Sequence, residues 1–354
     1  MPGFTVTTSS YNATVISLEH PWAEPPAPGT TTHVAPGIRW LRMPLPFALN
    51  HINLWLLDDG DGYTVVDTGL GLPDTRELWE RVFANELDGK PVTRVVATHF
   101  HPDHFGNTGW LTERWGVDLW CAQAEYQSAV IACEARGEAK LGKMIEHYRR
   151  HGVSAESLEK LRDRGNHYPS LVPTLPDTYR CLREGDSLTI GGRTWRVLIV
   201  LGHAPEHAAL WCPEMNVLIS GDQVLPKITT NVSIWWDRPR DNPLRLYLDS
   251  LARFRPMPED ALVLPSHGLP FRRLHARLDA LRAHHDERLS ETLDGLGEPR
   301  TAAEMVPVLF RRALDTHQLS FAIGEVLAHL NYLEAEGAVS RSASVNATER
   351  FQKA

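Results

Sequence analysis

The motif THFHPDH places four potential metal ligands within six residues: His99, His101, Asp103 and His104. Imidazole and carboxylate groups both bind metal ions, and such a density is rare by chance. The apolar run 94–97 just before the motif predicts a strand, and alternate residues leaving a strand can point to one side. We therefore expect His99 and His101 to share one ion. Asp103 and His104 would face a second ion about 3.5–4 Å away, the spacing of two-metal hydrolytic sites.

A site for two ions needs further ligands, and suitable residues follow three more predicted strands. The strand at 195–200 leads to His203, the strand at 217–220 leads to Asp222, and the strand at 261–264 leads to His267. In layered α/β proteins, the loops that leave strand ends gather functional groups at one edge of the sheets. The sequence thus predicts that four separate loops carry His or Asp to one place. For the motif alone, a polar loop with surface histidines stays open as the alternative.

This arrangement resembles the metallo-β-lactamase superfamily over roughly residues 50 to 270. The resemblance implies an α/β fold, a four-layer αββα sandwich. It also implies a ligand set: His99, His101 and His203 for the first metal ion, Asp103, His104 and His267 for the second, and Asp222 as a bridge. By the same resemblance, Asp67 orients the histidine motif from outside the ligand set. We expect His207 to support a ligand by a hydrogen bond without binding metal itself.

Nitrogen and carboxylate ligands without thiolate suit two divalent ions, most of all Zn²⁺, and iron or manganese also accept them. The surplus positive charge at such a centre favours a metal-bound hydroxide at neutral pH. The hydroxide would attack an ester-like carbonyl, with Asp103 and Asp222 as the catalytic carboxylates. We expect an acyl thioester on a small molecule or an acyl carrier, because the long segment 123–180 and the C-terminal unit resemble those of thioesterase-like members.

Three other functions stay open. The same metal site could hydrolyse a lactone or, as in ribonuclease-like members, a phosphodiester. An iron-dependent persulfide dioxygenase keeps a similar motif but engages one metal ion. A binding protein on a retained scaffold is the third alternative, although no expected ligand is missing. Metal content separates the hydrolases from the dioxygenase, because two zinc ions per chain exclude the dioxygenase, whereas one iron with oxygen uptake excludes hydrolysis.

The apolar patterns divide the chain into an extension, a catalytic domain and a small C-terminal domain. Residues 1–37 are rich in proline and read as an extension without regular structure, which either wraps the domain, pairs two subunits into a homodimer or stays loosely ordered. The catalytic domain spans 38–290, with 123–180 as a helical cap insertion. We expect strands at 38–42 and 52–57 and helices at 72–87, 242–254 and 272–293.

Residues 291–354 are expected to form a small, mainly helical domain that resembles a winged helix. Thr301 and Glu304 have the spacing of a capping box, and Gly337 predicts the end of a helix before a short strand. A winged helix suggests nucleic-acid binding, but this region carries six Lys or Arg against nine Asp or Glu. That balance has the wrong sign for a phosphate-binding surface.

Composition narrows the remaining possibilities. The net charge of −8 gives no support to nucleic acid or an anionic membrane as a partner. The four cysteines show no C-x-x-C spacing, and no long apolar run or leader pattern is present, so we expect a cytoplasmic protein. Trp235 and Trp236 follow the Asp222 strand and are a candidate wall for an apolar substrate; core packing or a subunit contact is the alternative.

Overall fold

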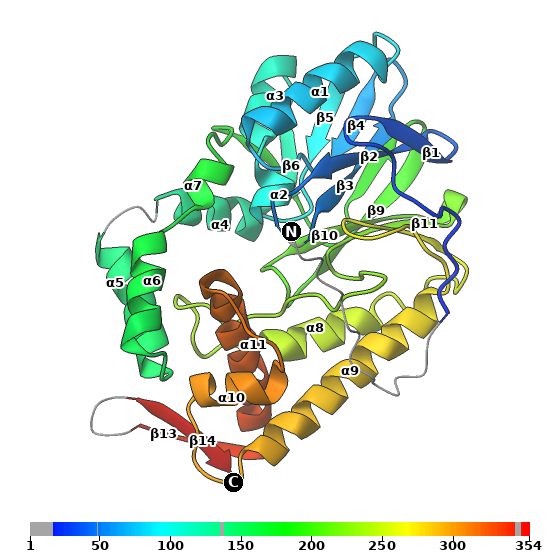
Figure 1. Cartoon of the computed structure of the whole chain (residues 1–354). Coiled ribbons are helices and arrows are strands. Elements are labelled where there is room, and N and C mark those ends of the chain that lie inside the picture. Colours follow the sequence, from blue (N-terminus) through cyan, green and yellow to red (C-terminus); the bar gives the residue numbers. More distant parts are fainter. Residues whose placement is uncertain (1–16, 48, 135–137, 344–347) are drawn as a thin grey trace, which may run out of the picture.

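The computed structural model describes residues 17–47, 49–134, 138–343 and 348–354, and two β-sheets packed face to face form its centre (Figure 1). The first sheet has seven strands, in which spatial order follows chain order. These strands are β1 (Thr31–Ala35), β2 (Ile38–Pro44), β3 (His51–Asp58), β4 (Tyr63–Val66), β5 (Val92–Val96), β6 (Leu119–Ala122) and β7 (Tyr179–Leu182). The strands up to β4 pair antiparallel, and those from β4 to β7 pair parallel.

The second sheet has five strands in the order β12-β11-β10-β9-β8. Their bounds are β8 (Ser187–Ile190), β9 (Arg193–Val200), β10 (His207–Cys212), β11 (Val217–Gly221) and β12 (Leu262–Pro265). Only β11 and β12 pair parallel in this sheet. A short 3₁₀ helix, Pro213–Met215, connects β10 to β11.

Successive side chains along a strand pack into different layers of the fold. In β3, Trp55 and Leu57 belong to the apolar core between the two sheets, whereas Leu54 and Leu56 belong to the core under the outer helices. Because successive side chains of a strand point to opposite faces, a strand buried on both faces requires a layer on each side.

Helices supply the two outer layers (Figure 1). Helices α1 (Pro73–Asn85) and α3 (Thr108–Trp115) cover the first sheet, and α8 (Pro243–Ala252) and α9 (Leu274–Gly295) cover the second. The predicted αββα sandwich is therefore confirmed. Most expected elements also lie within a few residues of their predicted positions.

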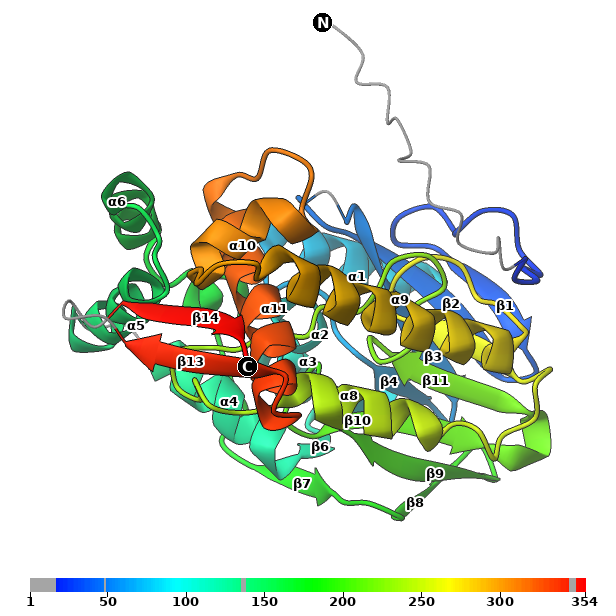
Figure 2. The ribbon, with the colours of Figure 1, turned by 90° about the horizontal axis from the view of Figure 1, so that it is seen from below.

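Four helices occupy the segment between β6 and β7. They are α4 (Gln123–Glu134), α5 (Glu138–Arg150), α6 (Ala155–Arg164) and α7 (Tyr168–Leu171). Helices α4 and α7 pack near the first sheet, whereas α5 and α6 extend to the C-terminal elements (Figure 2). Tyr148 and Leu161 join the same apolar core as Val326 of the C-terminal part.

The C-terminal part consists of α10 (Ala302–Leu309), α11 (Thr316–Ala335) and a hairpin of β13 (Val339–Ala343) and β14 (Glu349–Lys353). Both halves of the capping box between Thr301 and Glu304 are present at the start of α10. Helix α11 packs against α8 and α9, so this unit shares a core with the helices that cover the second sheet. Across the described residues, no helix combines the length and apolar character of a membrane span.

One expectation about the extension is wrong. Thr31–Ala35 lies in the stretch expected to lack regular structure, yet it forms β1 and pairs with β2. The turn between these strands contains Gly37 with φ of 75°, a conformation that glycine adopts at little cost. Pro28 precedes the strand and Pro36 follows it, so neither proline interrupts its hydrogen bonds. Residues 1–16 lie outside the described residues.

Candidate metal centre

The motif runs from the loop after β5 into the short helix α2 (Pro102–Phe105), which carries Asp103 and His104, at one edge of the first sheet. His99 Nε2 lies 3.0 Å from His101 Nδ1 and 3.2 Å from His203 Nε2. His203 comes from the loop after β9, in the other sheet. The structure thus brings together the three side chains expected to share the first ion.

The residues expected to share the second ion also meet. His267, in the loop after β12, places its Nε2 atom 3.4 Å from Asp103 Oδ2. The same carboxylate oxygen lies 3.7 Å from Nε2 of His104. Two ligand atoms each about 2.1 Å from one zinc ion lie about 3.4 Å apart at a tetrahedral angle. These separations therefore suit ligands of a common cation.

Asp222, at the end of β11, faces both groups. Its Oδ2 atom lies 3.5 Å from His203 Nε2, and its Oδ1 atom lies 3.5 Å from His104 Nε2 and 3.4 Å from His267 Nε2. One carboxylate oxygen is thus directed at each group. This is the position that a bridging ligand requires.

The outer nitrogens of His203 and His267 are held by the protein. The Nδ1 atom of His203 lies 2.7 Å from the carbonyl oxygen of Asn231, and that of His267 lies 2.9 Å from the carbonyl oxygen of His51. Metal-bound histidines commonly hold their second nitrogen in this way, which fixes the tautomer and aims the other nitrogen inward.

Two buried atoms at the centre fit a cation. His104 Nε2 and Asp222 Oδ1 have no hydrogen-bond partner in the described structure. Buried polar atoms are normally paired, so two orphans side by side point to a group that binds both. Three overlapping sets have ligand atoms within 4.8 Å of one another: His99, His101 and His203; His99, His104 and Asp222; and Asp103, His104 and His267. The residues present therefore fit two divalent ions.

Protonation agrees with this fit. Burial lowers the pKa of His101 to about 3 and that of His99 well below its usual range, so both rings are neutral and carry a free lone pair. Despite its burial, Asp222 has a pKa well below the usual range because His267 and His104 stabilise its charge. Burial opposes protonation of His267, but Asp222 and Asp103 raise its pKa to about 10. The carboxylates of Asp222 and Asp103 therefore stabilise positive charge at this centre. A bound cation would supply that charge once the histidine rings have lost their protons.

Asp67 directly follows β4 and connects the end of this strand to the THFHPDH motif. It is fully buried and accepts hydrogen bonds from Thr98 N at 2.7 Å and Thr98 Oγ1 at 2.9 Å. Its other contact is with His104 Nδ1 at 2.8 Å. Asp67 adopts a φ of 63°, a left-handed conformation that costs energy in a non-glycine residue and is typical of functional sites. The sequence-based expectation that Asp67 orients the motif agrees with these contacts.

His207 lies behind the first group, at the start of β10. Its Nε2 atom accepts a hydrogen bond from the backbone N–H of Asp222 at 3.1 Å, and its ring stacks on His99 with centroids 4.9 Å apart. Gly221 makes this contact possible, because a Cβ atom at this position would lie 2.2 Å from His207 Nε2. His207 therefore positions Asp222 and belongs to none of the three ligand sets.

Glu125 and Tyr168 hold the motif from the inserted helices, and no motif in the sequence marks either. Glu125, fully buried in the first turn of α4, accepts hydrogen bonds from Phe100 N at 2.9 Å and Glu206 N at 2.5 Å. Tyr168 in α7 donates its hydroxyl to the carbonyl oxygen of Phe100 at 2.5 Å. Burial raises the pKa of Glu125 to about 7. Phe100 separates His99 from His101, so the inserted helices fix the backbone of the metal loop.

Asn53 is a third residue that the sequence left without a role, although it lies in a predicted strand. Its buried amide donates to the carbonyl oxygens of Pro265 and Gly268, each at 2.8 Å. Its Oδ1 atom accepts a hydrogen bond from Trp40 Nε1 at 2.8 Å. Pro265 and Gly268 flank the loop of His267, so Asn53 ties that loop to the first sheet.

A small cavity of ≈ 70 Å³ adjoins the first group. Phe100, His101, His203 and Trp235 are among the residues that line it. Of the two candidate wall residues, Trp235 thus faces the cleft, and its ring contacts Phe321 of α11 at 5.6 Å between centroids. Trp236 is half-buried and is not part of this lining.

Comparison with known proteins agrees with the geometry. The family model of the metallo-beta-lactamase superfamily matches residues 49–267, and the model of the metallo-beta-lactamase-like C-terminal domain matches residues 289–354. A beta-lactamase domain protein from Burkholderia ambifaria is 49% identical, with a TM-score of 0.89 over 95% of this chain and 98% of its own. A metallo-beta-lactamase family protein from Thermus thermophilus is 33% identical, with a TM-score of 0.76 over 91% and 100%.

Two curated relatives are more distant. The probable metallo-hydrolase YqjP from Bacillus subtilis is 27% identical over 85% of this chain and 93% of its own length. The protein named acyl-coenzyme A thioesterase MBLAC2 from Gallus gallus is 27% identical over 53% of this chain and 63% of its own. The matched family model covers the metal motif and all three further loops that supply candidate ligands. The chain therefore belongs to the metallo-beta-lactamase superfamily.

Proposed function

We propose that the chain is a dinuclear metal-dependent hydrolase of ester-like carbonyls, with acyl thioesters as its substrates and zinc as its metal. The observation that carries this proposal is the orientation of Asp222, which directs one oxygen at His203 and the other at His104 and His267. His99 and His101 would complete the first site, and Asp103 the second.

Divalent ions bound here would supply Lewis-acid activation of water and of the scissile carbonyl. The ionised carboxylate of Asp103 lies beside His267 and can accept a hydrogen bond from the attacking water, which orients its lone pair toward the carbonyl carbon. Asp222, His207 and Asp67 hold the surrounding geometry. A thiolate leaving group needs little protonation, since a thiol has a pKa of about 8.5.

The cleft favours a thioester over a phosphodiester. Phe100, Trp235 and Leu246 make much of its lining apolar, and Arg238 is its one cationic side chain among the described residues. Asp237 and Asp241 each lie 3.8 Å from Arg238 Nε, which offsets that charge. A phosphodiester at this position would meet little positive charge from the protein.

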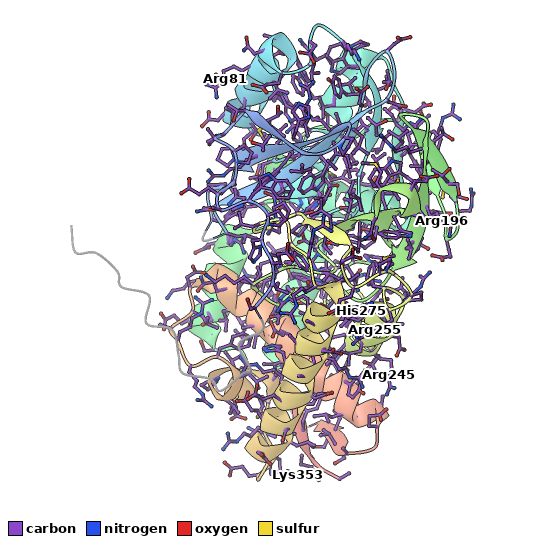
Figure 3. All side chains as sticks on the ribbon, turned by 90° about the vertical axis from the view of Figure 1, so that its right-hand side faces the viewer. Arg81, Arg196, Arg245, Arg255, His275 and Lys353 are labelled. Atoms are coloured by element: carbon purple, nitrogen blue, oxygen red, sulfur yellow. The ribbon has the colours of Figure 1, made fainter. Side chains whose placement is uncertain are left out.

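On the face in Figure 3, Arg81 lies near one end of the molecule and Lys353 near the other, with Arg196, His275, Arg255 and Arg245 between them. A relative supports the choice of a thioester. The relative MBLAC2 is named an acyl-coenzyme A thioesterase.

Hydrolysis of matched acyl thioester, lactone and phosphodiester substrates by the purified, metal-loaded protein tests the proposal. We expect turnover of the thioester and its loss in Asp222→Ala, with the fold retained by circular dichroism. Asp118→Ala removes an exposed carboxylate paired with Arg180 and serves as the matched control, with unchanged turnover expected. Preference for another substrate, or full activity in Asp222→Ala, would contradict the proposal.

A further inference from the structure

A second cavity, of ≈ 230 Å³, lies between α5, the C-terminal hairpin and the loop that follows β11. Six residues line it: Arg150, Arg240, Glu334, Arg341, Ser342 and Glu349. None of them belongs to the metal centre. Three guanidinium groups face two carboxylates, so the lining carries one net positive charge.

The three arginines of the lining differ in how many hydrogen bonds and ion pairs their guanidinium groups already make. The side chain of Arg341 is 6% exposed, and it is hydrogen-bonded to Glu334, Glu349 and Asn331. Arg240 is 60% exposed, and its ion pair with Glu349 is long, at 3.8 Å. Arg150 donates to Glu349 at 2.5 Å, but its Nε atom is buried and has no hydrogen-bond partner in the described structure. Arg240 and Arg150 therefore keep N–H groups that can donate hydrogen bonds to a ligand. Arg341 and Glu349 are held in place by their ion pair with each other.

Two buried histidines near the cavity-lining Arg150 also have unpartnered nitrogens. His147 lies in the last turn of α5 and His151 directly follows that helix, with ring centroids 4.7 Å apart and exposures of 8% and 2%. His147 Nε2 and His151 Nδ1 have no hydrogen-bond partner among the described residues. Both rings interact electrostatically with Glu349 and Arg150, which line the cavity. His147, His151 and Arg150 thus each keep an unpartnered buried nitrogen, and Arg150 lines the cavity, whereas buried polar atoms are normally paired.

This cavity lies beside the metal cleft, on the other side of one loop. Trp235 and Arg238 of that loop line the cleft, whereas Arg240 lines the second cavity. Asn331 of α11 holds the loop by donating to the carbonyl oxygens of Pro239 at 3.2 Å and Asp241 at 2.8 Å. A ligand that occupied both cavities would have to cross this loop, which is held in place by Asn331.

We propose that the second cavity binds the phosphate monoester of a coenzyme A thioester while the thioester group lies at the metal centre. This inference rests on the proposed thioesterase function. A doubly charged phosphate matches the planar donors of two arginines, which bind such groups by paired hydrogen bonds. The cleft beside the metal ligands offers only the offset charge of Arg238, so it would take the uncharged acyl end.

Binding of adenosine 3′,5′-bisphosphate, measured by calorimetry on the full chain, tests the site without any turnover. We expect Arg240→Gln and Arg150→Gln each to weaken binding about tenfold, the size of one lost charge-assisted hydrogen bond. Arg282→Gln removes an exposed arginine paired along α9 and is the control, with unchanged binding expected. Absence of binding to the native chain would overturn the proposal. Inorganic phosphate bound as tightly as the bisphosphate would overturn the coenzyme A assignment.

Kinetics separate this site from the proposed function. Arg240→Gln should raise KM for an acyl-coenzyme A about tenfold and leave kcat unchanged, while hydrolysis of the matching N-acetylcysteamine thioester, which has no phosphate, stays the same. An equal change for both substrates would overturn the site. If neither thioester is hydrolysed but the bisphosphate binds and depends on Arg240, the thioesterase function fails and the anion site stands.

Discussion

Replacing Glu125 tests whether the inserted helices hold the metal loop. Its two carboxylate contacts reach Phe100, between two candidate ligands, and Glu206, three residues after His203. Glu125→Gln keeps one acceptor and turns an amide N–H₂ toward a backbone donor, so one buried N–H loses its partner at a cost of about 1–3 kcal/mol. Glu125→Ala leaves two such donors, at about 2–6 kcal/mol. Because both metal-site loops then move, we expect metal affinity to fall on the order of 10- to 100-fold.

Urea unfolding and a metal titration against a competing chelator measure the two effects separately. Glu134→Gln is the matched control, because Glu134 is exposed at the other end of the same helix. We expect the control to keep the stability and metal affinity of the native chain. If Glu125→Gln also keeps both, the two hydrogen bonds do not position the loop, and the reasoning about the inserted helices is refuted.

Two further substitutions probe the packing around the site and the C-terminal domain. Gly221→Ala should lower the free energy of unfolding in urea more than Gly60→Ala does. Both glycines have a positive φ, which costs an alanine about 1–2 kcal/mol, but only a Cβ atom at Gly221 would also collide with His207. Equal losses in the two variants would contradict this packing argument. Burial raises the pKa of Glu325 to about 7, above its unfolded value, so its ionisation destabilises the fold as pH rises from about 4.5 through 7. Glu325→Gln should therefore be more stable than the native chain by about 1–2 kcal/mol at pH 8.5, a gain already reduced for the partial exposure of this side chain. At pH 4 the two proteins should differ little in stability. Plots of Tm against pH that run parallel for the two proteins would contradict this prediction.

The candidate metal centre could be predicted from the sequence because its candidate ligands follow strands. The motif after β5 and the exits of β9, β11 and β12 each combine an apolar run with a polar residue at its end. Parallel and antiparallel strands of two packed sheets bring such exits to one edge. Pairing His203 with His99, rather than with His104, required a family resemblance, because strand periodicity does not specify which loops meet.

The residues that hold the ligands could not be predicted in this way. Glu125 acts through backbone N–H groups, and Asn53 through carbonyl oxygens more than two hundred residues away. Such contacts leave no spacing pattern, since the partner can be any residue with a free backbone group. The pairing of β1 was missed for a related reason: a proline-rich stretch gives no sign of the strand edge available to it.

The proposed function requires seven side chains from four loops to hold a pair of cations. Elemental analysis of the purified, metal-loaded chain by mass spectrometry tests it most directly, together with Asp222→Ala. We predict two divalent ions per native chain and a loss of at least one in Asp222→Ala, because this carboxylate faces both groups of candidate ligands. A single ion per native chain, or an unchanged metal content in the variant, would contradict it.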